Sequence, residues 1–223
     1  MWRPYLTNFL KRMNFPNLKY ERCLWSENYR FVAGLDEVGR GAFAGPLVAG
    51  AVAFHIHQKI PSSVLINDSK RLSPRQRDKS SHWIKANVFS WGIGQVSVPF
   101  INKRGIVKAT QKAFRQAIQS ILKKNISSDI FILVDAFHIP YLCGIGKFKQ
   151  KAIVKGDQKS LSIAAASIIA KVYRDMYMIT LSKKVSQYGW EKNKGYGTEN
   201  HRKAIKKDGV SIYHRFDFVK DHV

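Results

Sequence analysis

Four acidic residues stand where α/β proteins place their chemistry, in a chain where basic residues far outnumber acids. Asp36 and Glu37 close one apolar run, Asp135 closes another, and Asp157 precedes a long helical pattern. Ligand and catalytic groups in open α/β sheets gather beyond strand ends, where loops leave a crevice. Acids that converge there repel one another, which favours a divalent cation among them.

The chemistry expected of such acids is metal-assisted phosphoryl transfer. Mg²⁺ and Mn²⁺ prefer oxygen ligands and combine few carboxylates with water and substrate phosphate. Two ions about 4 Å apart can activate a water and stabilise the leaving oxygen. The chain has 38 Lys and Arg against 15 Asp and Glu, a formal net charge of +23, which indicates a nucleic-acid partner. We therefore expect the basic surface to hold nucleic acid while the acids hold metal.

Each acid also has a plain structural interpretation as a turn former or cap. Asp36 and Glu37 raise a further difficulty, because adjacent strand residues point to opposite faces. Both can reach one site only if the chain leaves the strand there, which the following glycines allow. Asp175 competes with Asp157 but lies 18 residues further on, about 27 Å along a helix. We expect Asp175 to form an ion pair instead.

The elements that must position these acids follow from the hydrophobic pattern. Strands are expected at residues 30–36, 47–56, 89–98, 129–135 and, more weakly, 149–154. Helices are expected at residues 74–87, 102–123, for about 25 residues from 161, and from an N-cap at Thr198 to 207. This alternation predicts an α/β fold with a mixed sheet and a helical C-terminal segment beside it.

Composition limits the remaining classes. Cys23 and Cys143 lie far apart outside any CxxC pattern, which argues against a disulfide framework or a zinc site. A reducing interior follows, and we expect a cytoplasmic protein. The sequence has no run of 18 apolar residues, so no membrane-spanning helix is expected. The basic N-terminus fits a short arm better than an organellar presequence.

Five segments, in this order, resemble ribonuclease HII: DEVGRGAFAGPLVAGAV, NDSKRLS, ILVDA, KGDQKSLSIAAASIIAKVYRD and NKGYGTENH. The resemblance runs from about residue 17 to residue 218 and implies a ribonuclease H-like fold, a mixed sheet flanked by helices. Residues 1–29 are then a basic N-terminal extension, and residues 30–187 the catalytic domain. Residues 188–223 are then a helical, substrate-binding segment packed on that domain.

The resemblance also implies an activity. The family hydrolyses the RNA strand of RNA–DNA hybrids and cuts 5′ of single ribonucleotides in duplex DNA, leaving 3′-hydroxyl and 5′-phosphate ends. Asp36, Glu37, Asp135 and Asp157 match the acids that bind two Mg²⁺ or Mn²⁺ ions. The implied enzyme is a monomer whose partners are RNA–DNA hybrid and ribonucleotide-containing duplex DNA. A sliding clamp as a further partner has no support in the sequence.

Five further residues match substrate-binding positions of the family. Gly39, Arg40 and Gly41 match residues that sense the ribose 2′-hydroxyl, which a backbone without side chains can approach closely. Tyr196 matches a tyrosine that stacks on the deoxyribose after the ribonucleotide, and Lys70 is expected to contact phosphate. The structural alternatives are a glycine-rich turn, a half-buried tyrosine and a solvated lysine.

Other polar residues have simpler expected roles. Ser160 and Ser162 can cap the long helix or touch substrate, and capping is the preferred interpretation. His138, His201 and His214 can be read as bases or ligands, but an acid-based site makes surface or structural roles the better expectation.

Departures from the family leave some matters open. Ala42 replaces a frequent proline, and the tail HRFDF differs from the usual pattern, which leaves the C-terminal packing open. Three rival functions remain. Ribonuclease HIII shares the acids but typically carries a large N-terminal domain, for which the roughly 30 residues before the first strand are too few. A non-catalytic nucleic-acid binder leaves the acids unexplained, and a junction resolvase needs no 2′-hydroxyl.

Overall fold

A five-stranded mixed sheet forms the centre of the protein, as seen in the computed structural model, which describes residues 15–56, 58–122, 130–140 and 149–222. The strands are β1 (Phe31–Val38), β2 (Leu47–Phe54), β3 (Ser90–Val96), β4 (Ile130–Asp135) and β5 (Gln150–Ile153). Their order in the sheet is β3-β2-β1-β4-β5. The β1, β2 and β3 neighbours pair antiparallel, whereas β1–β4 and β4–β5 pair parallel. The predicted α/β fold with a mixed sheet is confirmed.

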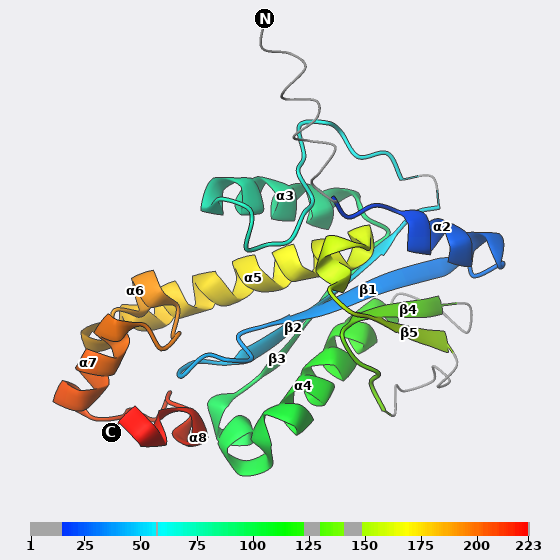
Figure 1. The fold of residues 1–223 in the computed structure, drawn as a ribbon. Helices are drawn as coiled ribbons and strands as arrows, with labels where there is room; N and C mark the ends of the chain where they lie inside the picture. The colour runs from blue at the N-terminus through cyan, green and yellow to red at the C-terminus, as the bar shows by residue number, and fades with distance from the viewer. Residues whose placement is uncertain (1–14, 57, 123–129, 141–148, 223) are drawn as a thin grey trace, which may run out of the picture.

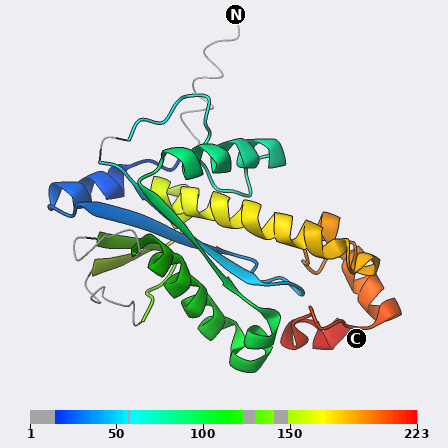
Figure 2. The same ribbon diagram turned by 180° about the vertical axis from the view of Figure 1, so that it is seen from behind.

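Helices cover both faces of the sheet (Figures 1 and 2). They are α2 (Lys19–Ser26), α3 (Pro74–Asn87), α4 (Val98–Leu122), α5 (Leu161–Ser182), α6 (Trp190–Asn193), α7 (Glu199–Asp208) and α8 (Phe216–Val219). Helix α4 packs on one face in one apolar cluster, while α5, with α3 and α2, packs on the other. No helix in the described ranges has the length and apolar character needed to cross a membrane.

Close contact between α5 and the sheet depends on small residues. A Cβ atom on Gly34 of β1 would lie 2.2 Å from the backbone of Ile163, and one on Gly50 of β2 would lie 2.3 Å from the carbonyl oxygen of Ala166. Both glycines therefore let the helix lie directly on the strands. The alanines at 164–166 are fully buried there, as expected of small residues at a tight interface.

Several element boundaries differ from the expected ones. Strand β1 does not end at Asp36 but continues to Val38, because β2 keeps pairing with it as far as Val38 opposite Val48. Strands β2 and β3 end two residues early, and α4 begins at Val98. Gly105 interrupts α4 with a φ of 77°, so the predicted regular helix is kinked. The predicted helix end at residue 123 and the predicted strand start at residue 129 both lie outside the described residues.

Two terminal regions complete the fold. Helix α2 was not expected from the sequence, and it packs against the sheet through Leu24 and Trp25. At the other end, α6, α7 and α8 gather around the buried Trp190, as the predicted helical C-terminal segment. Within the tail, Phe218 lies under the guanidinium of Arg215, while Phe216 is exposed.

Candidate active site

One pocket of about 530 Å³ contains every site residue predicted from the sequence. The four acids lie in its wall together with the three residues of the GRG turn, Lys70 and Tyr196. The wall residues are Asp36, Glu37, Val38, Gly39, Arg40, Gly41, Ser69, Lys70, Asp135, Asp157, Ser167, Lys171 and Tyr196. Segments far apart in the chain thus meet at one place beside the ends of β1 and β4.

The arrangement of strands explains why three of the acids meet. Strand β4 pairs with β1 only as far as Leu35 opposite Val134, and Asp135 is its last residue. From Asp36 onward, the edge of β1 that faces β4 is no longer paired, whereas the other edge of β1 still pairs with β2. Asp36 and Glu37 therefore reach one pocket without the chain leaving the strand, and the expectation that it must leave there was wrong.

A tight turn brings Asp157 to the same pocket. Asp157 lies in the short 3₁₀ helix η2 (Gly156–Gln158), which follows the left-handed residue Lys155. The backbone N–H of Gly156 donates to Oδ1 of Asp135 at 2.7 Å, so the turn is bonded directly to the end of β4. A Cβ atom on Gly156 would lie 2.6 Å from Cδ1 of Ile163, so a larger residue there would require the Ile163 side chain to move.

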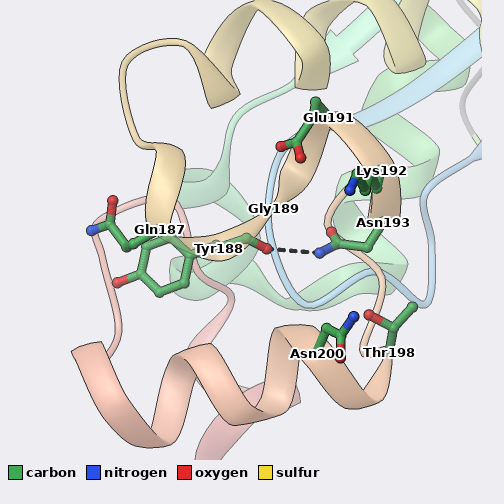
Figure 3. Close-up of a pocket in the computed structure, with 8 residues that line it drawn as sticks. All are labelled: Gln187, Tyr188, Gly189, Glu191, Lys192, Asn193, Thr198 and Asn200. Carbon is green, nitrogen blue, oxygen red and sulfur yellow. Dashed lines mark hydrogen bonds between the residues drawn. The ribbon is translucent and has the colours of Figure 1, made fainter.

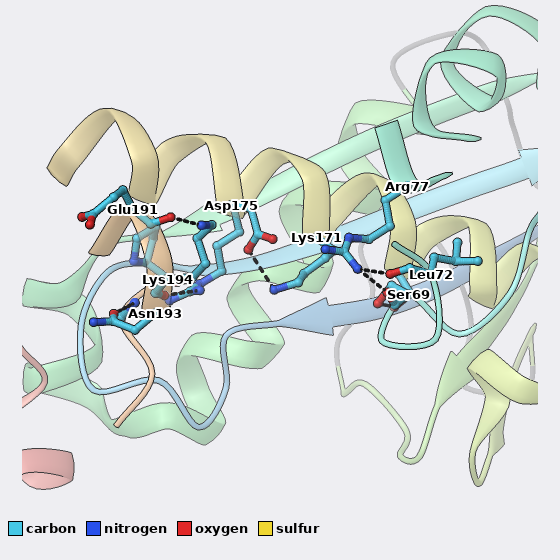
Figure 4. Close-up of polar contacts among 12 residues, drawn as sticks. Ser69, Leu72, Arg77, Lys171, Asp175, Glu191, Asn193 and Lys194 are labelled. Carbon is cyan, nitrogen blue, oxygen red and sulfur yellow. Dashed lines mark hydrogen bonds and ion pairs between the residues drawn. The ribbon is translucent and has the colours of Figure 1, made fainter. Parts of the chain in front are cut away.

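Asp175 lies outside this group, as predicted. Its Oδ1 accepts from Nζ of Lys171 at 2.8 Å, an ion pair one helical turn apart on α5 (Figure 4). It lines a different pocket of about 350 Å³ between α3 and α5. The predicted choice of Asp157 over Asp175 therefore agrees with the geometry.

Without a cation, burial and repulsion from neighbouring carboxylates disfavour the charged forms of the four acids. Burial raises the pKa of all four carboxyls above its ordinary value. The pKa of Asp36 is raised well above it, first by burial and then by the carboxylates of Glu37, Asp135 and Asp157, against a hydrogen bond from Ser167. The pKa of Glu37 is raised less because Arg40, 3.5 Å away, favours its charged form.

The donor set suits a hard divalent cation completed by substrate. No group of three or more His, Cys, Asp or Glu in the described part of the chain is arranged to hold a metal ion by itself. Mg²⁺ usually takes only one or two carboxylates and fills its other positions with water and phosphate oxygens. Because the pKa values of the four acids are raised, a positive charge bound in this pocket would stabilise their charged forms. These residues therefore fit a metal held jointly with a nucleic-acid backbone.

Two buried arginines shape the turn that carries Gly39 and Gly41. Arg215 donates to the carbonyl oxygens of Gly39 at 2.6 Å, Arg40 at 3.0 Å and Gly45 at 2.8 and 3.0 Å. Arg174 donates to the carbonyl oxygens of Pro46, Ala44 and Lys194 at 2.9 to 3.0 Å. Both side chains are fully buried, and the acceptors of these hydrogen bonds are backbone carbonyl oxygens rather than carboxylates. These hydrogen bonds therefore fix the conformation of the turn.

The two glycines of the turn differ in their surroundings. Gly39 has a φ of 89°, and a Cβ atom on it would lie 2.1 Å from Nε of Arg174. A Cβ atom on Gly41 would meet no heavy atom within 4 Å. Gly39 is therefore required by the fold, whereas the space beside Gly41 is open to a ligand.

Tyr196 faces the turn across the pocket. Two cations lie over its ring, Nζ of Lys171 at 5.6 Å and the guanidinium of Arg174 at 5.3 Å from the centroid. Nδ1 of His201 lies 2.9 Å from the carbonyl oxygen of Tyr196, and only the ring nitrogen can donate there. The tyrosine is held at both its ring and its backbone.

The histidines have structural roles, as expected. His201 and His214 are fully buried, with their Nε2 atoms 3.1 Å apart, and Nε1 of Trp190 donates to His201. Burial lowers the pKa of both, that of His214 to about 4. His138 is exposed and lines no part of the pocket. The buried His214 and Arg215 also settle the packing of the divergent tail.

Some residues beside the acids were missed from the sequence. Ser69 and Ser167 share a hydrogen bond of 2.9 Å in the pocket wall, and Lys171 lies next to them. No local sequence pattern marks this contact, because the two serines are 98 positions apart in the chain. Asp68 was also missed, and its charge raises the pKa of Asp135 and Asp157.

Another pocket, of about 440 Å³, lies between α6 and the start of α7 (Figure 3). Its wall contains Tyr188, whose carbonyl oxygen accepts from Nδ2 of Asn193, together with Thr198 and Asn200. None of the four acids reaches it. The chemistry of the acids therefore belongs to the pocket at the ends of β1 and β4.

Comparisons with known proteins agree with one another. The family model described as ribonuclease HII matches residues 33–222. A ribonuclease HII of Caldanaerobacter subterraneus subsp. tengcongensis is 45% identical over 201 residues, 90% of this chain and 79% of that protein. The crystal structure of ribonuclease H2 from Pyrococcus horikoshii has a TM-score of 0.67 at 25% identity, over 86% of this chain and 96% of that one. The fold of Bst-RNase HIII in complex with Mn²⁺ is also similar, with a TM-score of 0.68 at 19% identity, over 87% of this chain and 69% of that one.

Proposed function

This chain belongs to the ribonuclease HII family of endonucleases, which hydrolyse phosphodiester bonds in RNA–DNA hybrids, and we propose that it also cuts duplex DNA 5′ of a single embedded ribonucleotide. The products are 3′-hydroxyl and 5′-phosphate ends. One observation carries the proposal: the four acids, the GRG turn and Tyr196 line a single pocket. A metal-binding function, a sensor of the sugar and an aromatic platform are thereby combined.

The acids and the basic residues around them have different proposed roles, metal binding and phosphate binding. Asp36, Glu37, Asp135 and Asp157 would hold two divalent ions, Mg²⁺ or Mn²⁺, between themselves and the scissile phosphate. When bound, these ions supply an activated water and charge stabilisation for the leaving 3′-oxygen. Lys70 lowers the pKa of Asp135 and Asp157 by its charge and is placed to contact a phosphate in the same pocket.

The GRG turn is the proposed sensor of the ribose. The 2′-hydroxyl distinguishes RNA from DNA at a site, and only backbone without a side chain can approach a sugar so closely. The open space beside Gly41 fits such an approach. Arg215 and Arg174 hold the turn from behind, so the backbone donors keep their direction before substrate arrives.

Gly41→Ala is expected to fold like the wild type yet lose activity. The added methyl group enters the open space where the sugar would lie, so kcat/KM on a duplex with one ribonucleotide should fall by roughly 10- to 100-fold. Thermal unfolding and single-turnover cleavage measure the two effects. Gly39→Ala is the matched comparison, because its φ of 89° alone costs about 1–2 kcal/mol of stability. Wild-type cleavage by Gly41→Ala would contradict the sensor role.

Tyr196 gives a second test of the substrate path. Tyr196→Phe keeps the ring beneath Lys171 and Arg174 and should cleave within about threefold of the wild type. Tyr196→Ala removes the platform, and a stacking contribution of about 1–3 kcal/mol corresponds to roughly 5- to 150-fold in kcat/KM. Equal activity of the two variants would exclude stacking as the role of this ring.

The activity itself is tested by mapping cleavage to single-nucleotide resolution. The substrates are a DNA duplex with one ribonucleotide, an RNA–DNA hybrid, an all-DNA duplex and a branched all-DNA junction, each with Mg²⁺ or Mn²⁺. We expect cuts immediately 5′ of the ribonucleotide and throughout the hybrid, with none in all-DNA. Cleavage confined to the long hybrid would refute the single-ribonucleotide activity. Cleavage of branched all-DNA junctions would indicate a resolvase.

A further inference from the structure

Glu21 of α2 connects the N-terminal segment to the catalytic turn. Its side chain is fully buried, and its Oε1 accepts three hydrogen bonds from the start of α5. The donors are Oγ of Ser160 at 2.6 Å, Oγ of Ser162 at 2.7 Å and the backbone N–H of Ser162 at 2.9 Å. These contacts join residues about 140 positions apart, and they lie three to five residues beyond Asp157.

Backbone hydrogen bonds from the segment before Glu21 also reach the residues on either side of Ser160. The N–H of Asn17 donates to the carbonyl oxygen of Lys159 at 3.2 Å, and the N–H of Leu161 donates to that of Asn17 at 3.1 Å. Asn17 and Ser160 thus form a short parallel bridge. Chain on both sides of Ser160 is therefore fixed to the N-terminal segment.

The turn that is held in this way carries catalytic groups. Ser160 donates its N–H to the carbonyl oxygen of Gly156 at 2.8 Å, and Gly156 donates its own N–H to Asp135 at 2.7 Å. Asp157 lies between these two anchors. A continuous set of hydrogen bonds therefore runs from Glu21 through the turn that carries Asp157 and ends on Asp135.

Packing alone does not account for a carboxyl group at this position. Leu24 and Trp25 already dock α2 on the apolar cluster under β1 and α5. Among the residues that the structure describes, none donates a hydrogen bond to the buried Oε2 of Glu21, and this costs free energy that an apolar side chain would not. A feature that is unfavourable for folding and bonded to an active-site turn indicates a functional constraint.

We propose that Glu21 is a positioning residue that fixes the turn of Asp157, and that the catalytic unit begins at the N-terminal segment rather than at β1. The proposal rests on the assignment of Asp135 and Asp157 to the nuclease site. Without Glu21, Ser160 and Ser162 lose their common acceptor, and the turn gains freedom at the position where metal and phosphate must be held.

The test compares Glu21→Ala with two controls, one within α2 and one at its C-cap. Glu27→Ala removes an exposed carboxylate, and Leu24→Ala removes buried packing without touching Ser160 or Ser162. For Glu21→Ala we expect kcat to fall roughly 10- to 100-fold and the Mn²⁺ concentration for half-maximal cleavage to rise. Binding of uncleaved RNA–DNA hybrid without metal should stay within about twofold of wild type, since the acids are not needed for it.

A second readout is independent of catalysis. Hydrogen exchange of the metal-free protein should be faster at residues 156–163 in Glu21→Ala, while α3 keeps its wild-type protection. Glu21→Gln, which retains one acceptor oxygen, should recover part of both kcat and protection. Hydrogen exchange also distinguishes failure of the nuclease assignment from failure of the role of Glu21. If the wild type cleaves no hybrid, the nuclease assignment is wrong, but exchange still shows whether Glu21 holds residues 156–163.

The results that would overturn the proposal are equally clear. If Leu24→Ala lowered kcat and raised the Mn²⁺ requirement as much as Glu21→Ala, Glu21 would only dock α2. Wild-type kcat in Glu21→Ala, or unchanged exchange at residues 156–163, would also exclude the role. Wild-type behaviour is expected of Glu27→Ala, and an equal loss there would implicate charge rather than the hydrogen bonds.

Discussion

Asp36→Asn is expected to lose cleavage by about 10³-fold or more, because it removes a carboxylate that we propose holds metal against the scissile phosphate. Charge stabilisation by a catalytic metal supplies several kcal/mol, and each 1.4 kcal/mol corresponds to tenfold in rate. The amide keeps the shape of the side chain, and its Oδ1 can still accept from the N–H of Glu37. Single-turnover cleavage of an RNA–DNA hybrid measures the loss, and Asp208→Asn, an exposed acid at the end of α7, is the control.

The same substitution should stabilise the metal-free protein. The pKa of Asp36 in the folded protein lies well above its ordinary value of 3.8, owing to burial and to the neighbouring carboxylates. A raised pKa means that the folded state holds the proton more tightly than the unfolded state does. Stability of the wild type is therefore lost as the pH rises above about 3.8, and Asp36→Asn escapes that loss.

Thermal unfolding in EDTA between pH 3.5 and 8 measures this difference. The variant should match the wild type at the lowest pH and exceed it increasingly toward neutral pH. Adding Mn²⁺ should raise the unfolding temperature of the wild type more than that of the variant. A variant less stable than the wild type at pH 7 in EDTA would show that the acids do not repel one another in the pocket.

Arg215→Met is expected to damage both stability and activity. Methionine fills the space but leaves the carbonyl oxygens of Gly39, Arg40 and Gly45 without the donors that now reach them. Buried groups left without partners cost about 1–3 kcal/mol each, and removal of a buried charge returns part of that. We expect a net loss of about 2–5 kcal/mol in the free energy of unfolding.

The activity of Arg215→Met should fall by about 100-fold in kcat/KM, because the GRG turn loses its support. Urea unfolding and cleavage of a single-ribonucleotide duplex measure the two quantities at a temperature where the variant is folded. Arg202→Met is the matched control, since the exposed Arg202 side chain donates a hydrogen bond to the carbonyl oxygen of Gly197, away from the GRG turn. Cleavage by Arg215→Met within threefold of the wild type would show that the turn keeps its shape alone.

Elements with their own local signals were predictable from the sequence. Helix α3 begins at Pro74 after the N-cap Ser73, and α5 begins after the N-cap Ser160, as the turn chemistry indicates. The end of β1 was not predictable, because it depends on how long β2 keeps pairing with it. Helix α2 was missed because its face toward the protein includes an acid, Glu21, which a hydrophobic pattern does not anticipate.

The site shows the same limit. The acids could be predicted because strand ends and their order along the chain restrict where ligands gather. Ser69 and Ser167 could not, since their hydrogen bond joins residues 98 positions apart. Arg174 and Arg215 were missed for another reason: buried arginines are rare, and their partners are carbonyl groups that every residue carries.

The long sequence separation between Arg215 and the turn that it supports has a consequence for the protein during its synthesis. The guanidinium bonds to the carbonyl oxygen of Gly39, which was made 176 residues earlier. At about 5–20 residues per second, roughly 10 to 35 s separate the two on the ribosome. Late in that interval the growing chain carries all four acids of the pocket and most of its positive charge, but Arg215 does not yet support the turn. We expect the nascent polypeptide to bind nucleic acid first and to become a nuclease only after Arg215 has emerged and bonded to Gly39.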